Sequence, residues 1–264
     1  MMKKLLGFSL LLLLNTLGSA FAIELCQADL QVGFVDFKTN HIWNRNGKKI
    51  STYSDFHLRA IPVYLDTYIT TIDCLSINSA YIWIEEELNG TSRGIADSEL
   101  TWTHFFYLDK INTVSFQTTA IIPSGKQIYN LRYGKWGGQF DILYSRVQKI
   151  KCQTLFFDSI IGYRFYKGFP SDQVRGYLSC GSYVFKNIYL DGSLNFQYGL
   201  FNGKSKFNYP LYLLNPNYRL LRADLKAAYC FYNQFYLSAG VFKHLWGQNV
   251  ATGSGYFIEG WIKY

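Results

Sequence analysis

The sequence predicts an all-β protein, an antiparallel transmembrane β-barrel of about 12 strands with both termini in the periplasm. Three observations predict it: apolar and polar residues alternate with a period of two along the chain, aromatic residues make up 19% of it, and charged residues only 17%. Successive strand side chains point to opposite faces, so a wall between lipid and water requires this alternation. Soluble domains carry about a quarter charged residues, whereas membrane barrels place aromatic girdles at both interfaces.

The first 22 residues have the pattern of a cleavable secretory signal. A basic start precedes an apolar run from Leu5 to Leu14, and small residues including Ala20 and Ala22 follow it, as in an A-x-A cleavage site. The apolar run is about ten residues long, half of what a helical membrane span needs. We therefore expect cleavage after Ala22, with residues 1–22 removed and residues 23–264 forming the barrel.

Charge and cysteine spacing argue against several function classes. The formal net charge is +8, but the basic residues are scattered along a chain that we expect to be exported. We therefore expect no nucleic-acid partner. The surplus of positive charge suits contact with anionic lipopolysaccharide. The cysteines form no C-x-x-C pair, so they are interpreted as small apolar strand residues, with one disulfide as an alternative. They are Cys26, Cys74, Cys152, Cys180 and Cys230.

About twelve alternating segments can be counted, and an even number is needed for both ends to lie in the periplasm, which leaves ten or fourteen as alternatives. The clearest segment runs from Leu190 to Leu200, where leucines and aromatic residues alternate with Asp191, Ser193 and Asn195. Around Gly181 neither face is clearly polar, so the register there stays open. The segments are centred on Val32, Ala60, Ser79, Trp102, Thr118, Ile142, Ile161, Gly181, Phe196, Leu225, Gly240 and Glu259.

The connections alternate in length, as expected if short turns face the periplasm and long loops face outward. We predict short turns at 71–73, 109–110, 186–187 and 233–234. Longer loops are predicted at 44–47, 89–91, 124–126, 169–172 and 204–217. Two residues resist the pattern: Pro62 lies mid-strand without an amide donor, so we expect a bulge or an interruption there, and Lys243 has lipid-facing parity, which a bulge or a position above the hydrocarbon band would relieve.

The last segment alternates up to an aromatic final residue. This pattern resembles the carboxy-terminal signal by which outer-membrane barrels are recognised for insertion. We therefore expect the barrel-assembly machinery as a partner during insertion. The residues of this predicted insertion signal are Tyr256, Ile258, Gly260, Ile262 and Tyr264.

The sequence does not predict an enzyme, a cofactor or a metal site. The four histidines lack the His-x-Ser strand pairing of outer-membrane phospholipases, although a lipid hydrolase remains an alternative. We expect His41 in a loop, His104 facing lipid and His244 near the outer rim. The acidic run 85–87 is interpreted as a solvated rim and not as a calcium site, because no spaced oxygen-ligand loop accompanies it.

Charged residues of both signs fall on the inward parity of the predicted strands. They are expected to line a conduit or to pair across it and close it. A twelve-stranded barrel lies between the filled eight-stranded kind and the open porins, so we expect a narrow or occluded lumen. The predicted lumen-lining residues are Asp29, Arg59, Glu99, Asp141, Asp158, Arg164, Asp191, Arg222, Asp224, Lys226 and Glu259.

Short motifs in the middle of the chain carry a family resemblance. Gly94 and Asp97 precede one strand, and Pro123 and Gly125 follow the next outward strand. This pattern resembles the outer-membrane transporters named for the meta-pathway of phenol degradation and the XagA-like outer-membrane proteins. The resemblance implies an uptake or surface role and structural roles, in loop entry and turn, for these four residues.

Together these features predict a porin-like channel or transporter for small solutes, apolar or aromatic ones included, in the outer membrane of a Gram-negative bacterium. Outer-membrane lipid and lipopolysaccharide are its expected surroundings. A lateral path for apolar substrates would be sought at Pro62. The alternative is a non-conducting surface or structural barrel whose outer loops, notably 209–214, bind envelope or host partners.

Overall fold

The computed structural model describes residues 28–87, 90–109, 111–124, 134–150, 153–168, 170–203, 217–232 and 235–263. Several predicted features lie outside these residues. They are the signal with Ala20 and Ala22, Cys26, Cys152, Gly125, Tyr264, the turn 233–234 and loop 209–214.

The described chain forms one antiparallel sheet that closes on itself into a 12-stranded barrel, because β2 pairs with β1 on one side and with β3 on the other. Two further strands, β4 and β5, pair with successive halves of β3 and so occupy one position in the wall. The predicted number of strands is therefore confirmed. The strands are β1 (Ala28–Trp43), β2 (Lys49–Tyr68), β3 (Asp73–Glu86), β4 (Gly90–Ile95), β5 (Ser98–Leu108), β6 (Asn112–Ile122), β7 (Gly137–Ile150), β8 (Gln153–Tyr166), β9 (Gln173–Phe185), β10 (Ile188–Gly199), β11 (Arg219–Tyr232), β12 (Phe235–Gln248) and β13 (Val250–Lys263).

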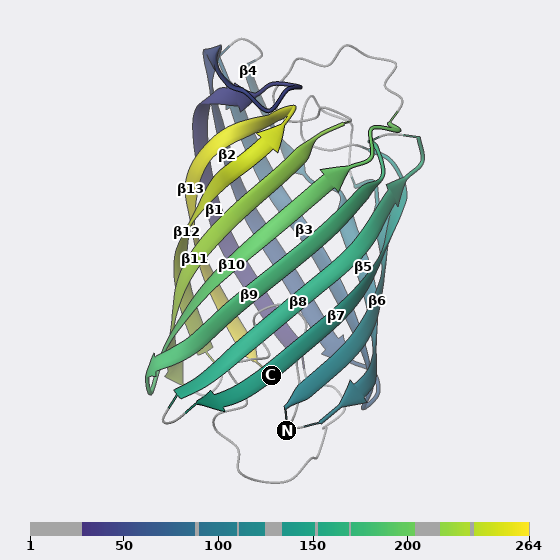
Figure 1. Cartoon of the computed structure of the whole chain (residues 1–264), viewed down its shortest axis with the longest axis vertical. Coiled ribbons are helices and arrows are strands. Elements are labelled where there is room, and N and C mark those ends of the chain that lie inside the picture. The colour runs from purple at the N-terminus through teal and green to yellow at the C-terminus, as the bar shows by residue number, and fades with distance from the viewer. Residues whose placement is uncertain are drawn as a thin grey trace.

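Each of the twelve predicted segment centres lies in a different strand of the wall. The strands run obliquely around the barrel, and β13 closes it beside β1, with Asp29 opposite Lys263 (Figure 1). Short connections such as 69–72 and 186–187 gather at the end of the barrel where Asp29 lies opposite Lys263. In outer-membrane barrels the end with the short connections is the periplasmic end. No helix in the described residues is long and apolar enough to span a membrane.

The turn predicted at 109–110 is held by a carboxylate. The side chain of Asp109 accepts hydrogen bonds from the backbone N–H groups of Ile111 (2.6 Å) and Asn112 (2.5 Å), and from the Tyr107 hydroxyl (2.7 Å). These contacts favour the ionised form and lower the pKa of Asp109 to about 2. At the opposite end Asn249 alone joins β12 to β13, with a φ of 52° that asparagine tolerates better than most residues.

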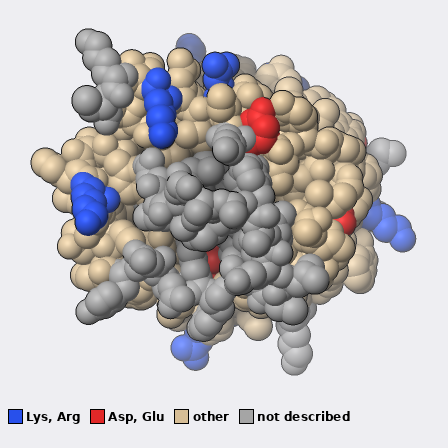
Figure 2. Space-filling view, turned by 90° about the horizontal axis from the view of Figure 1, so that it is seen from below, with Lys and Arg blue, Asp and Glu red and all other residues tan. Residues whose placement is uncertain are grey.

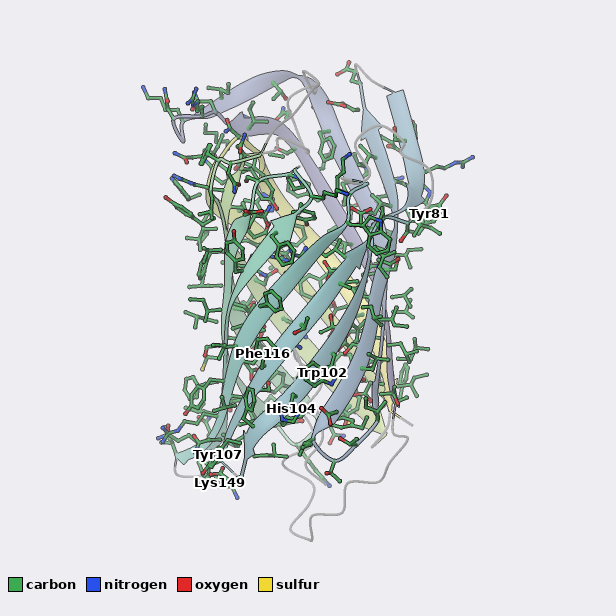
Figure 3. All side chains as sticks on the ribbon, turned by 90° about the vertical axis from the view of Figure 1, so that its right-hand side faces the viewer. Tyr81, Trp102, His104, Tyr107, Phe116 and Lys149 are labelled. Carbon is green, nitrogen blue, oxygen red and sulfur yellow. The ribbon has the colours of Figure 1, made fainter. Side chains whose placement is uncertain are left out.

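The two faces of the wall differ as the alternation predicts. Outward side chains are apolar and exposed, such as Leu225 at 64%, Ile142 at 58% and Ile161 at 58%, whereas the inward neighbours Asp141 and Lys226 are only 3% and 6% exposed. Outward aromatic side chains lie at both ends of the wall: Tyr81 lies towards the outer end and Tyr107 towards the periplasmic end (Figure 3). This face suits lipid contact, with aromatic rings near both interfaces.

Three apolar clusters occupy parts of the barrel interior. One contains Tyr68, Cys74, Phe105 and Leu143, and a second contains Phe156, Tyr189, Ala228, Tyr236 and Trp261. Both clusters lie towards the periplasmic end, because most of their residues are within a few positions of the periplasmic ends of their strands. The third lies towards the outer end, on β1, β2, β3, β12 and β13, and contains Phe37, Phe56, Ile84, Phe242, Ala251 and Phe257.

Pro62 interrupts pairing without a bulge. The pairs Val32–Val63 and Val35–Ala60 keep one register, and the two β1 residues between them have no partner on β2. One of these is Gly33, where an added Cβ would lie 3.1 Å from the Pro62 ring. The expected interruption is therefore present, and it is local because β2 still pairs with β3 at Pro62.

Other sequence expectations are settled by the strand bounds. His41 lies within β1, opposite Thr252, so its expected loop position is wrong; β1 extends further because both neighbouring strands continue beside it. Lys243 is exposed on the outer face, and the register shifts directly beyond His244. Among the described cysteines, Cys74 is buried, Cys230 is half-buried and Cys180 is exposed.

Candidate functional site

A cavity of about 360 Å³ lies on the inner wall of the barrel. It is formed by side chains of β2, β3 and β5 to β10, and many of its polar groups come from the outer halves of β7, β8 and β9. Its charged and hydrogen-bonding walls include Glu99, Gln139, Asp141, Arg164, Arg175 and Tyr177.

One connected polar network crosses this cavity. Arg164 forms an ion pair with Glu99 (2.7 Å) and donates its Nε hydrogen to the carboxamide oxygen of Gln139. Arg175 donates to the same oxygen at 3.2 Å. The amide nitrogen of Gln139 in turn donates to both carboxylate oxygens of Asp141, at 2.7 Å each. Gln139 therefore connects two guanidinium groups to one carboxylate.

A glycine on β8 makes room for this network. Gly162 faces inward opposite Asp141, and a Cβ added there would lie 1.8 Å from the Asp141 Oδ1 atom. Gly162 is also the register partner of Arg175 on β9. Without a side chain between them, the Arg175 guanidinium reaches across β8 to Gln139 on β7.

A second charged group lies on β10, β11 and β13. The Lys226 side chain is 5% exposed and lies opposite Asp191 in the register, and its Nζ lies 3.8 Å from the Glu259 carboxylate. The same ammonium lies 5.6 Å from the centre of the Trp261 ring, at the edge of the second apolar cluster. Ser238 also donates to Glu259 (3.3 Å). This lysine therefore faces carboxylates from two other strands.

Ten of the predicted lumen-lining residues have inward side chains in the structure. Besides those already described, Asp29 is 1% exposed and its backbone N–H donates to the Asp66 carboxylate (3.2 Å). Arg222 binds Asp224 through its Nε (2.7 Å). The ten are Asp29, Glu99, Asp141, Asp158, Arg164, Asp191, Arg222, Asp224, Lys226 and Glu259.

The prediction for Arg59 is wrong, because this side chain points outward. Its guanidinium lies 3.6 Å from Asp36 and 3.3 Å from Glu85, and its neighbours Leu58 and Ala60 fill the interior instead. The hydrocarbon band is only about 25 Å tall, whereas β2 has 20 residues. Above that band the outer face meets water and headgroups, so charge no longer marks the inward side.

This placement predicts a small effect for Arg59→Gln. Because the side chain is 42% exposed and faces away from the interior, its ion pairs should contribute about 1 kcal/mol or less to stability. Solute flux through proteoliposomes should stay at the wild-type value, while the inward variant Arg222→Gln should change it. A flux change in Arg59→Gln as large as in Arg222→Gln would contradict the outward placement.

Sequence reasoning missed Arg175, Gln139 and Asp66. All three share parity with side chains that the structure buries, such as Ser179 on the strand of Arg175. Alternation of Arg175, Tyr177 and Ser179 against Leu178 was a usable signal. It was obscured because Gly181 and its neighbours have no clearly polar face.

The side chains of three histidines have partners in the described residues. His57 faces outward beside Arg59 and contacts Asp36 at 2.8 Å, and His104 contacts Asp73 at 2.9 Å on the outer face. His244 donates to the backbone oxygen of Ala251 (2.9 Å). Within the described ranges, no three His, Cys, Asp or Glu side chains are grouped as a metal site.

The acidic run 85–87 is only partly exposed to solvent. Of the acidic run, Glu85 is about half exposed but Glu86 is only 3% exposed, so the solvated-rim interpretation is wrong for Glu86, which faces inward on β3. Seen from the periplasmic end, the basic side chains of the described residues lie apart from one another (Figure 2).

Comparisons with known proteins identify the fold. No family model matches the sequence, and no curated protein matches it. The structure is similar to the COG4313 outer-membrane channel from Pseudomonas putida F1, with a TM-score of 0.74 at 13% identity, covering 94% of this chain and 98% of that one. It is also similar to the NanC porin, with a TM-score of 0.53 at 7% identity, covering 89% of this chain and 98% of that one. The fold is that of outer-membrane barrels, in agreement with the predicted location.

The motifs behind the family resemblance have structural positions. Gly94 lies in β4, Asp97 directly precedes β5, and Pro123 directly follows β6. Ser124 links the two motifs, since its hydroxyl lies 2.6 Å from that of Ser98. The comparisons show the fold of outer-membrane barrels, and they do not confirm the narrower phenol-pathway or XagA-like family.

Proposed function

We propose that the protein, exported with residues 1–22 removed, is a narrow outer-membrane channel for small solutes. The observation that carries this proposal is the pair of opposite faces: an apolar outer wall encloses an inner wall with a charged, hydrogen-bonded cavity. A solute that cannot cross lipid would meet polar groups along the inner wall. The barrel fold shared with the outer-membrane channel supports the same function.

The apolar clusters support a narrow path and a preference for solutes with apolar or aromatic parts. Tyr189 is 1% exposed and contacts Phe156 and Tyr183, with ring centres 5.8 and 5.3 Å away. Nearby, Tyr236 and Trp261 stack with their ring centres 5.0 Å apart. Such rings restrict the interior towards the periplasmic end and offer surfaces on which a flat apolar group can pack.

Solute flux into proteoliposomes tests the proposal. The wild-type protein should admit arabinose and exclude the trisaccharide raffinose, and it should admit phenylalanine faster than the smaller but more polar glutamine. Tyr189→Ala should admit raffinose measurably, because it removes an inward ring. The control Tyr229→Ala removes an outward ring that is 42% exposed, and it should leave the flux of arabinose and of raffinose unchanged. Arabinose flux no faster than in protein-free liposomes would refute the channel.

A further inference from the structure

The side chains around Gln139 hold two positive charges close together. The guanidinium groups of Arg164 and Arg175 both donate to one carboxamide oxygen. Like charges that lie close together repel each other, and an anion beside them offsets this repulsion. Arg164 has that anion, since Glu99 lies 2.7 Å from its Nη2 atom.

Arg175 differs from Arg164 in this respect. In the described part of the chain no carboxylate lies within 4.0 Å of its guanidinium, and its one hydrogen bond is to Gln139. A guanidinium carries five N–H donors, so Arg175 retains donors that Gln139 does not use. Arg175 lines the 360 Å³ cavity, and these donors are therefore available to a molecule inside it.

The neighbouring groups restrict the charge of that molecule. Asp141 is within the same cavity and is held by the Gln139 amide, and Glu99 lies beyond Arg164. These two carboxylates would repel a multiply charged anion. A single carboxylate is compatible, because its two oxygens match the planar fork of a guanidinium. Ile160 and Tyr177 line the same cavity and offer apolar surface for the rest of the solute.

We propose that Arg175, positioned by Gln139 and by the open space at Gly162, forms a binding subsite for small solutes that carry one carboxylate. The subsite deepens the proposed channel function, on which its role in transport rests. It would hold a carboxylate in the outer half of the barrel, before the apolar clusters at the periplasmic end.

Binding of butyrate and of its uncharged analogue butyramide to the full chain in detergent tests the subsite, with ligand-observed NMR as the readout. Wild-type protein should bind butyrate and show little binding of butyramide. Arg175→Gln should weaken butyrate binding by about tenfold or more, the loss expected for a charge-assisted pair. Arg175→Lys keeps the charge but loses the fork, and should fall between the two. The matched control is Arg146→Gln, an exposed arginine on β7 outside the cavity, which should bind as wild type does.

Equal binding of butyrate and butyramide, or undiminished butyrate binding in Arg175→Gln, would overturn the subsite. Far-UV circular dichroism verifies that each variant is folded, and if Arg175→Gln fails to fold, Arg175→Lys decides alone: undiminished affinity contradicts the need for the fork. Flux of the same two solutes separates this proposal from the channel itself. Butyrate binding that depends on Arg175, without flux of either solute, would leave the subsite standing and refute transport.

Discussion

Replacing Lys226 with methionine is expected to lower the free energy of unfolding by roughly 3–5 kcal/mol, the cost of removing one partner of a buried ion pair. The Lys226 side chain is 5% exposed, lies 3.8 Å from the Glu259 carboxylate and is the register partner of Asp191. Methionine has nearly the same length but no charge, so both carboxylates would lose their nearest cation in a poorly hydrated region. Urea unfolding of the barrel in lipid vesicles, followed by tryptophan fluorescence, measures the change.

The matched control is Lys149→Met, the same substitution at an exposed lysine at the periplasmic end of β7 (Figure 3). Its unfolding free energy should stay within about 0.5 kcal/mol of wild type, as for most surface substitutions. Adding Glu259→Gln to Lys226→Met should recover part of the loss, because one unpaired charge is then removed. If Lys226→Met costs no more than Lys149→Met, the ammonium is not needed inside the barrel.

Leu225→Arg is expected to destabilise the barrel by roughly 2–4 kcal/mol, the cost of arginine on the lipid face near the bilayer midplane. Leu225 is 64% exposed and lies midway along β11, with the outward Ala223 and Ala227 on either side. Its partners across the sheet are Gly192 and Val241, which also face outward. The same vesicle unfolding assay measures the loss.

Ser51→Arg provides the control for Leu225→Arg. Ser51 is exposed near the outer end of β2, above the region where outward residues are apolar, so arginine there should cost less than about 1 kcal/mol. Equal costs at the two positions would mean that the apolar outer face is not embedded in lipid at Leu225.

The alternation of apolar and polar residues along the strands explains why the fold could be predicted from the sequence. Where one face of a strand meets lipid and the other a polar interior, as in β10 and β11, alternation specifies both the strand and the face that points outward. Asp191 and Leu225 are clear instances, one 4% and the other 64% exposed. The turn at Asp109, whose side chain accepts hydrogen bonds from the backbone of the turn itself, could also be predicted from the sequence.

The interior could be predicted only in part, because its polarity is not uniform. Towards the outer end of β2 the inside is apolar, with Phe56 and Ala60 buried, and the outside is charged, so parity assigned Arg59 to the wrong face. Arg175 was missed for a different reason: its role depends on Gly162 and Gln139 of other strands. Such contacts depend on the register between neighbouring strands. The residue pattern of one strand alone does not specify that register.

Planar-bilayer recording of the purified full chain tests the central claim most directly. A narrow channel should give discrete, small conductance steps in potassium chloride, and Tyr189→Ala should enlarge them because it removes a ring from the periplasmic half of the interior. The lipid-facing control Tyr229→Ala should leave the steps unchanged. Urea-resistant β-structure verifies that the wild-type and Tyr189→Ala proteins are inserted in the bilayer. If both are inserted and neither gives conductance steps, the result contradicts the claim that this barrel conducts solutes.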